Sequence, residues 1–286
     1  MPRNTRPENA IRPGSSRPIA LTIAGSDSGG GAGIQADLHT FAAFGVHGVT
    51  AITAITAQNT RQVTAIQPVT GMLLEAQLDA LFADFPIAAI KIGMLGSASI
   101  ARSVAATLKR HPKIPVVLDP VLVATSGDAL AMGGVAAALR RHLFPHASLL
   151  TPNIPEVEQL LGRRIDNADA MLTAAHALRE LGAKAVLLKG GHAAGGKKPT
   201  PVIRDLLVTV RGARWHEHPR LPFEGHGTGC SLAAAIAAGL ARGNALETAV
   251  ADAIDFVQHA LANAYSPGSG AVRVLDHHAA KSPPKR

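Results

Sequence analysis

The sequence predicts an α/β fold in which a mostly parallel central sheet lies between two layers of helices. Short runs rich in β-branched residues recur along the chain, and most of them are separated by stretches with the apolar spacing of helices. Two further helical stretches follow the last of these runs. Alternation of this kind builds βαβ units, whose strands are parallel and covered on both faces.

The elements follow one another in a regular order. Strands are expected at residues 18–25, 48–57, 63–69, 88–94, 115–119, 148–153, 185–191 and 205–210. Helices are expected at residues 34–44, 72–85, 98–110, 135–143 and 168–181, and the closing pair at 228–242 and 245–264. Ligands of such sheets bind at the carboxyl ends of the strands, so chemistry is expected there.

Composition favours one domain with basic tails. The chain has 286 residues, of which 47% are hydrophobic, and no long linker or repeat divides it. We expect one domain at 18–278 and disordered tails at 1–17 and 279–286. Each tail carries a net charge of +3, so only +2 of the total +8 remains for the domain. The charge therefore does not predict nucleic-acid binding.

The cysteine count and the length of the apolar stretches predict the cellular compartment. A single cysteine, Cys230, excludes an intramolecular disulfide and favours a reducing cytoplasm. The longest apolar stretch, 232–241, is about half as long as a bilayer span requires. The sequence therefore predicts a cytoplasmic protein without a membrane partner.

Two phosphate-binding patterns match only in part. The segment 191–198, GHAAGGKK, has Walker A spacing but ends in lysine where Ser or Thr must hold magnesium, and prolines follow it. The segment 31–36, GAGIQA, fits a dinucleotide motif, yet no acidic residue lies between Asp37 and Glu75 to bind a ribose. Both patterns are rejected.

The segment HGTGC, residues 226–230, opens an alanine-rich helical run. Its glycines allow successive N–H groups to point at one ligand, and a helix start attracts anions. Cys230 would have a lowered pKa at such a place. The alternative is that Cys230 is a small buried core residue.

Other polar residues stand where strands end. Asp119 ends one strand and Lys189 another, while Asn153 and Glu156 are spaced three apart at a helix start. They suit magnesium and phosphate, although turn formation and helix capping explain the acidic and amide residues equally well.

Taken together, these segments resemble one family. The stretch 21–60, LTIAGSDSGGGAGIQADLHTFAAFGVHGVTAITAITAQNT, is similar to the amino-terminal signature of the hydroxymethylpyrimidine/phosphomethylpyrimidine kinases of thiamine biosynthesis. KIGML, VVLDPV, TSGD, TPNIPEVEQL, LLKGGH and HGTGC follow in the order typical of that family. The resemblance covers residues 18–262. It implies the three-layer αβα fold of the ribokinase-like superfamily, often found as a homodimer.

The resemblance also implies a substrate pocket. Asp37 and Gln58 would hydrogen-bond the aminopyrimidine, with Gly25 and Met94 beside it. A flat heterocycle with ring nitrogens and an amine needs paired donors and acceptors, which a carboxylate and an amide supply.

The cofactors implied are ATP and Mg²⁺. By similarity, Asp119 and Glu156 would hold the metal, while Asn153, Lys189 and His226 would bind the nucleotide. Phosphoryl transfer depends on alignment and charge neutralisation, and these residue types provide both.

The glycine segment would supply the catalytic group. Backbone N–H groups of Gly227, Thr228, Gly229 and Cys230 would bind the transferred phosphoryl group. Cys230 would accept the proton of the hydroxymethyl group. Its role is open, because related sugar kinases carry Asp at this position.

The pattern differs from the family at several positions. Thr125 stands where Lys is common, Gly225 and Ser231 stand where Thr is frequent, and the 193–201 segment is atypical. The resemblance implies phosphorylation of 4-amino-5-hydroxymethyl-2-methylpyrimidine and then of its monophosphate. The alternatives are a pyridoxal/pyridoxine kinase and a non-catalytic ligand-binding relative.

Overall fold

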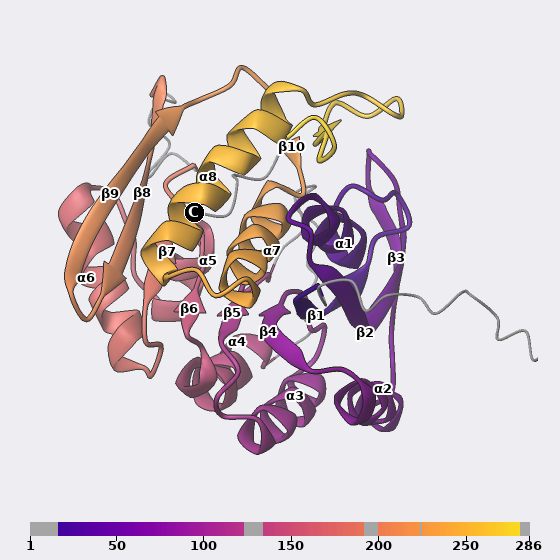
Figure 1. Ribbon diagram of the computed structural model, residues 1–286. Helices are drawn as coiled ribbons and strands as arrows, with labels where there is room; N and C mark the ends of the chain where they lie inside the picture. The colour runs from indigo at the N-terminus through magenta and orange to yellow at the C-terminus, as the bar shows by residue number, and fades with distance from the viewer. Residues whose placement is uncertain (1–16, 123–133, 192–199, 224, 281–286) are drawn as a thin grey trace, which may run out of the picture.

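The computed structural model describes residues 17–122, 134–191, 200–223 and 225–280. Thr125, positions 193–199 of the atypical segment and most of both predicted tails lie outside these residues. The described chain forms a nine-stranded sheet with helices on both faces, and a two-stranded sheet stands beside it (Figure 1).

The large sheet has a parallel centre and antiparallel edges. Its strands are β1 (Ile19–Ser26), β2 (His47–Gln58), β3 (Val63–Pro68), β4 (Ile87–Ile92), β5 (Val116–Leu118), β6 (Leu149–Leu150), β7 (Val186–Leu188), β8 (Val202–Thr209) and β9 (Gly212–Pro219). Their spatial order is β3-β2-β1-β4-β5-β6-β7-β8-β9. Strands β2, β1, β4, β5, β6 and β7 are parallel, whereas β3, β8 and β9 pair antiparallel. This arrangement confirms the mostly parallel sheet.

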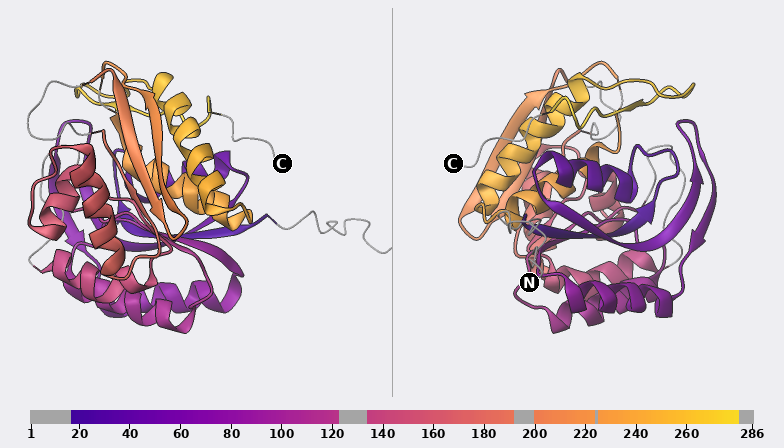
Figure 2. Two further views of the ribbon diagram at one scale, coloured as in Figure 1. Left: turned by 90° about the vertical axis from the view of Figure 1, so that its left-hand side faces the viewer. Right: turned by 45° about the vertical axis from the view of Figure 1, so that its right-hand side comes forward.

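Helices cover both faces of the sheet (Figure 2). They are α1 (Gly33–Ala43), α2 (Gly71–Asp84), α3 (Ala98–Arg110), α4 (Val135–Ala138), α5 (Ile154–Leu161), α6 (Ala168–Glu180), α7 (Thr228–Ala241) and α8 (Leu246–Ala262). A π-helical turn (Leu139–Leu143) and a 3-10 turn (Phe144–His146) continue α4. The small sheet pairs β10 (Gly225–His226) with β11 (Arg273–Val274).

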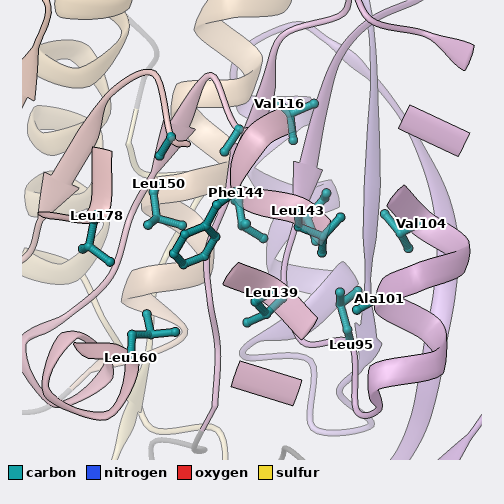
Figure 3. Packing of buried hydrophobic residues seen from close by; sticks show 14 of the residues in the cluster. Leu95, Ala101, Val104, Val116, Leu139, Leu143, Phe144, Leu150, Leu160 and Leu178 are labelled. Atoms are coloured by element: carbon teal, nitrogen blue, oxygen red, sulfur yellow. The ribbon is translucent and has the colours of Figure 1, made fainter. Parts of the chain in front are cut away.

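Two apolar clusters hold the layers together. One packs the helices from α2 through α6 against one face of the sheet. Phe144, Leu150 and Leu178 lie in this cluster (Figure 3). The other joins α1, α7 and α8 to the opposite face, where small alanine side chains let α7 approach α8 closely. Burial on both faces explains why the central strands read as continuous apolar runs.

The structure confirms the predicted helices to within two residues at each end, except that 135–143 is α-helical only in its first turn. It adds β9 and the small sheet, which the sequence did not indicate. No helix in the described residues is long and apolar enough to cross a membrane.

Candidate active site

A cavity of about 680 Å³ opens at the carboxyl ends of the parallel strands. All of the residues predicted for the site line it except Asp37. They reach it from β1, β2 and β10, the ends of β4, β5 and β7, and the starts of α5 and α7. The fold therefore brings together residues from both ends of the domain.

The glycine turn, residues 227–229, begins α7 on the cavity wall. Gly227 has φ +81°, and a Cβ at this position would overlap the carbonyl oxygen of Gly31. The N-cap, Gly227, has no side chain with which to bond the first-turn N–H groups. A Cβ on Gly229 would lie 3.2 Å from Lys189 Nζ. The turn therefore directs backbone donors toward a space that a lysine also faces.

Lys189 and Asp119 form an ion pair beside the glycine turn. Lys189 Nζ lies 2.9 Å from Asp119 Oδ1, which also accepts a 3.0 Å hydrogen bond from Thr151 Oγ1. Burial alone would lower the pKa of Lys189, but Asp119 and Glu156 outweigh it and raise that pKa. The lysine thus stays charged, as a phosphate contact requires.

Glu156 has a structural role as well as a predicted ligand role. Its Oε2 accepts the Asn153 N–H at 2.8 Å, and Asn153 Oδ1 accepts the Glu156 N–H at 2.8 Å. This capping box fixes the start of α5. Burial raises the pKa of Glu156 to about 7, although Lys189 opposes the shift. The capping explanation of the Asn153–Glu156 spacing is therefore confirmed, and both side chains still face the cavity.

The two carboxylates fit a magnesium ion. Mg²⁺ is commonly bound through one or two carboxylates together with phosphate oxygens and water. The described residues contain no cluster of three or more His, Cys, Asp or Glu side chains that could enclose a metal alone. Asp119 and Glu156 thus suit an ion that arrives with a nucleotide.

Asp37 lies behind the cavity wall instead of on it. Its side chain is completely buried, with Oδ2 bonded to Lys91 Nζ at 2.8 Å and to Thr22 Oγ1 at 2.6 Å. Lys91, which the sequence did not single out, lines the cavity in front of it. In this conformation Asp37 meets a lysine, and its contact with the pyrimidine stays a prediction.

The lowered pKa expected for Cys230 is wrong. Burial raises the pKa of this thiol to about 11, and the nearby Lys91 only partly opposes the shift. The loss of hydration outweighs the helix start, although the half-buried residue still lines the cavity. In the described chain the thiol is therefore protonated at neutral pH.

His226 lies with the predicted substrate residues. Its Nε2 is 3.0 Å from Asp27 Oδ2 and 3.1 Å from Gln58 Nε2, and neither Asn153 nor Lys189 bonds to it. On the same wall, Gly25 leaves room for Met94, whose Cε would overlap a Cβ at position 25. The structure thus places His226 beside Gln58, and its contact with the nucleotide stays a prediction.

The sequence analysis also missed Asp27. Its carboxylate accepts backbone N–H groups of Gly29 at 2.7 Å, Gly31 at 3.1 Å and Ala32 at 2.8 Å. An Asp followed by Ser and glycines is the composition of an Asx turn, so this signal was present in the sequence. Burial would raise the pKa of Asp27, but the His226 and backbone hydrogen bonds outweigh it and lower that pKa.

Comparison with known proteins agrees with this geometry. The family model described as phosphomethylpyrimidine kinase matches residues 27–275. A hydroxymethylpyrimidine/phosphomethylpyrimidine kinase of Rhizobium meliloti is 48% identical over 261 residues, which cover 91% of this chain and 96% of that protein.

Solved structures share the fold. A phosphomethylpyrimidine kinase of Clostridium difficile is 39% identical, with a TM-score of 0.75 over 85% of this chain and 99% of that one. A Staphylococcus aureus pyridoxal kinase in complex with AMP-PCP and pyridoxal is 32% identical, with a TM-score of 0.83 over 92% and 94%. The fold is therefore ribokinase-like, and the chain belongs to the phosphomethylpyrimidine kinase family.

Proposed function

We propose that this protein transfers the γ-phosphoryl group of ATP to 4-amino-5-hydroxymethyl-2-methylpyrimidine and then to the resulting monophosphate, as a step toward thiamine diphosphate. The observation that carries the proposal is one cavity lined by the glycine turn, the Lys189–Asp119 pair and the Gln58 wall. Such a cavity accommodates an anionic donor and a flat polar acceptor together.

The nucleotide side would work by charge neutralisation. Lys189 and the N–H groups of the glycine turn face the same space, so both can stabilise a transferring phosphoryl group. Asp119 and Glu156 would hold Mg²⁺, which supplies positive charge at the phosphate oxygens when bound. Asn153 fixes Glu156 through the capping box.

The acceptor side would orient the heterocycle. Gln58, Gly25 and Met94 line one wall, which suits a flat ring with polar edges. Cys230 directly follows the glycine turn in sequence and lines the same cavity, so its thiol would take the hydroxyl proton. With a pKa near 11, the thiol requires bound ligands to favour its thiolate form.

Incubation of the purified protein with ATP, Mg²⁺ and each candidate heterocycle, followed by product mass, tests the proposal. A diphosphate of the pyrimidine supports it. Phosphorylation of pyridoxal alone would favour the pyridoxal kinase alternative, which the fold likeness to a pyridoxal kinase makes the appropriate rival. Absence of ATP turnover with either compound would favour a non-catalytic relative.

The role of Cys230 is tested by Cys230→Ala. We expect the first phosphorylation to slow by about 100-fold, because a hydroxyl must lose its proton to attack. The second should slow by less than about tenfold, since the accepting phosphate is already ionised at pH 7. Single-turnover rates for each step provide the measurement, and equal losses in both steps would contradict the role.

The remaining assignments are part of the same proposal. A kinase of small vitamin precursors acts in the cytoplasm, and we propose a homodimer on the basis of the family resemblance. No nucleic-acid or membrane partner is proposed. Sedimentation of the purified protein measures the oligomeric state, and a monomer at micromolar concentration would contradict the homodimer.

A further inference from the structure

The side-chain amide of Gln58 has two polar neighbours, His226 and Thr56, and its present orientation forms a good hydrogen bond with neither. His226 Nε2 faces Asp27 Oδ2 at 3.0 Å and Gln58 Nε2 at 3.1 Å. Thr56 Oγ1 faces the Ser26 carbonyl oxygen at 2.8 Å and Gln58 Oε1 at 3.3 Å. Each of these two centres carries at most one hydrogen, so the donors and acceptors can be assigned.

The hydrogen on His226 Nε2 is fixed by Asp27. Three backbone N–H groups and the imidazole surround the Asp27 carboxylate, and these hydrogen bonds keep its pKa low despite burial. An ionised carboxylate only accepts, so Nε2 of His226 must donate whether the ring is neutral or charged. A donating Nε2 cannot also accept from a Gln58 N–H group.

The hydrogen bonds of Thr56 indicate the same orientation of the Gln58 amide. Its hydroxyl hydrogen goes to the Ser26 carbonyl oxygen, which is the shorter of its two contacts. The hydroxyl oxygen is therefore free to accept but not to donate toward Gln58. A 180° rotation of the Gln58 amide removes both conflicts. Its oxygen then shares the His226 N–H with Asp27 in a three-centre hydrogen bond, and its nitrogen donates to Thr56.

The backbone around Gln58 is already held. Its N–H donates to Ser28 Oγ at 2.8 Å, and its carbonyl oxygen accepts from the same hydroxyl at 2.8 Å. The contacts with His226 and Thr56 therefore need to fix only the side-chain torsions of Gln58. With the oxygen engaged by His226, one Gln58 N–H group has no assigned acceptor in the described chain, and the side chain lines the cavity.

We propose that Asp27 and His226 are positioning residues that hold the Gln58 amide with its oxygen toward His226, so that Gln58 offers the cavity an N–H donor. The group that it selects is then an acceptor, such as an unprotonated ring nitrogen, and not an exocyclic amine. This specificity rests on the proposed function. The orientation itself does not, because it follows from the hydrogen bonds of the free protein.

The first test measures the orientation without turnover. In ¹⁵N spectra of protein with labelled histidine, Nε2 of His226 should have the shift and one-bond coupling of a nitrogen that carries hydrogen. The His226→Gln variant assigns the signal. An Nε2 without hydrogen would overturn the proposal, whatever the activity of the protein.

The second test measures specificity with two pyridine analogues, each with one ring nitrogen of the pyrimidine replaced by C–H. The wild type should lose about 10- to 100-fold in kcat/KM on one analogue, since the bound ring would cover the Gln58 donor and leave it unpaired. Two variants should reduce this ratio of kcat/KM between the two analogues to below about threefold, mainly through KM. They are Gln58→Glu, which has no amide donor, and His226→Met, which no longer holds the amide. His226→Gln, whose amide nitrogen can replace Nε2, should restore it.

Gln67→Glu is the matched control, because Gln67 is a β3 residue outside the cavity lining. It should keep the wild-type ratio. Wild-type turnover of the pyrimidine with no discrimination between analogues would overturn the proposed specificity while leaving the proposed function standing. No wild-type turnover of the pyrimidine would instead refute the proposed function, and the nitrogen spectra would still decide the orientation.

Discussion

The Cys230 thiol shows how burial and a helix start compete at one atom. The helix start and a backbone contact from Gly33 favour a thiolate, but loss of hydration has the larger effect and raises the pKa to about 11. The sequence indicated the helix start correctly and left burial of the cysteine open as the alternative. Burial depends on α1, which packs against α7 from nearly 200 residues away in the chain.

This pKa predicts slow modification of Cys230 at neutral pH. Because Cys230 is the only cysteine of the chain, alkylation by iodoacetamide reports on this thiol alone. The rate should rise with pH throughout the range from 7 to 10, since the thiolate fraction grows tenfold per unit well below the pKa. Cys230→Ser should not be labelled. A rate that levels off near pH 8 would contradict the prediction.

Lys91 and Asp37 form a fully buried ion pair. Lys91→Met should destabilise the protein by about 3–5 kcal/mol, because it leaves the Asp37 carboxylate buried and uncompensated. Adding Asp37→Asn should recover part of that loss. Urea unfolding of the single and double variants measures the coupling.

The same Lys→Met change at the exposed Lys109 is the control for that cycle, and it should alter the free energy of unfolding by less than about 0.5 kcal/mol. If Lys91→Met lowers the free energy of unfolding no more than Lys109→Met does, the Lys91–Asp37 pair does not stabilise the protein as predicted.

At the scale of elements, the start of α7 depends on one backbone conformation. Gly227 and Gly243 both have positive φ, +81° and +86°, but only a Cβ at Gly227 would meet another chain segment. Gly243→Ala should cost about 1–2 kcal/mol through strain alone. Gly227→Ala adds an overlap with the Gly31 carbonyl oxygen and should lower kcat by about 100-fold or more by displacing the donors of the turn.

Measuring kcat and thermal unfolding for both glycine variants separates these effects. Gly243→Ala should keep near wild-type turnover at a temperature where the variant is folded. Equal turnover in the two variants would show that the turn is not part of the phosphoryl site.

Helices and central strands were predictable because their apolar spacing is long and regular. Strand β9 was missed because GARWHEHP has no apolar alternation, and it lies on an exposed edge of the sheet where burial imposes none. The direction of β3 and β8 was not predictable either, since a β-branched run does not tell a parallel neighbour from an antiparallel one. The short β10 and β11 depend on contacts between distant segments.

At the scale of the whole molecule, strand-end placement made the cavity predictable. Parallel strands end at one edge, so Asp119, Asn153 and Lys189 were expected to meet, and they line one cavity. The exchange of Asp37 for Lys91 on the wall was not predictable. It depends on how α1 packs on the sheet, which brings Asp37 against Lys91, the residue before the last one of β4.

Global stability should depend on pH through Glu156. Its pKa is about 4.5 in the unfolded chain and about 7 in the folded one, so the unfolded state loses this proton first as pH rises. The contribution of Glu156 therefore becomes less favourable between pH 4.5 and 7, by about 1–3 kcal/mol, and is constant above 7.

Glu156→Gln keeps a side-chain oxygen for the capping box and removes the titration. Relative to this variant, the wild type should lose free energy of unfolding between pH 4.5 and 7, as measured by urea unfolding at each pH. Parallel pH curves for the two proteins would contradict the raised pKa.

The hydrogen bond between Asp27 and His226 joins positions 199 residues apart. At about 5–20 residues per second, a ribosome that has made the first partner needs roughly 10–40 s to reach the second. During that time a nascent chain holds one half of the pocket without the other. The enzyme is thus expected to acquire ligand binding only near the end of its synthesis, and premature termination before the last two long helices would release chains without a complete pocket.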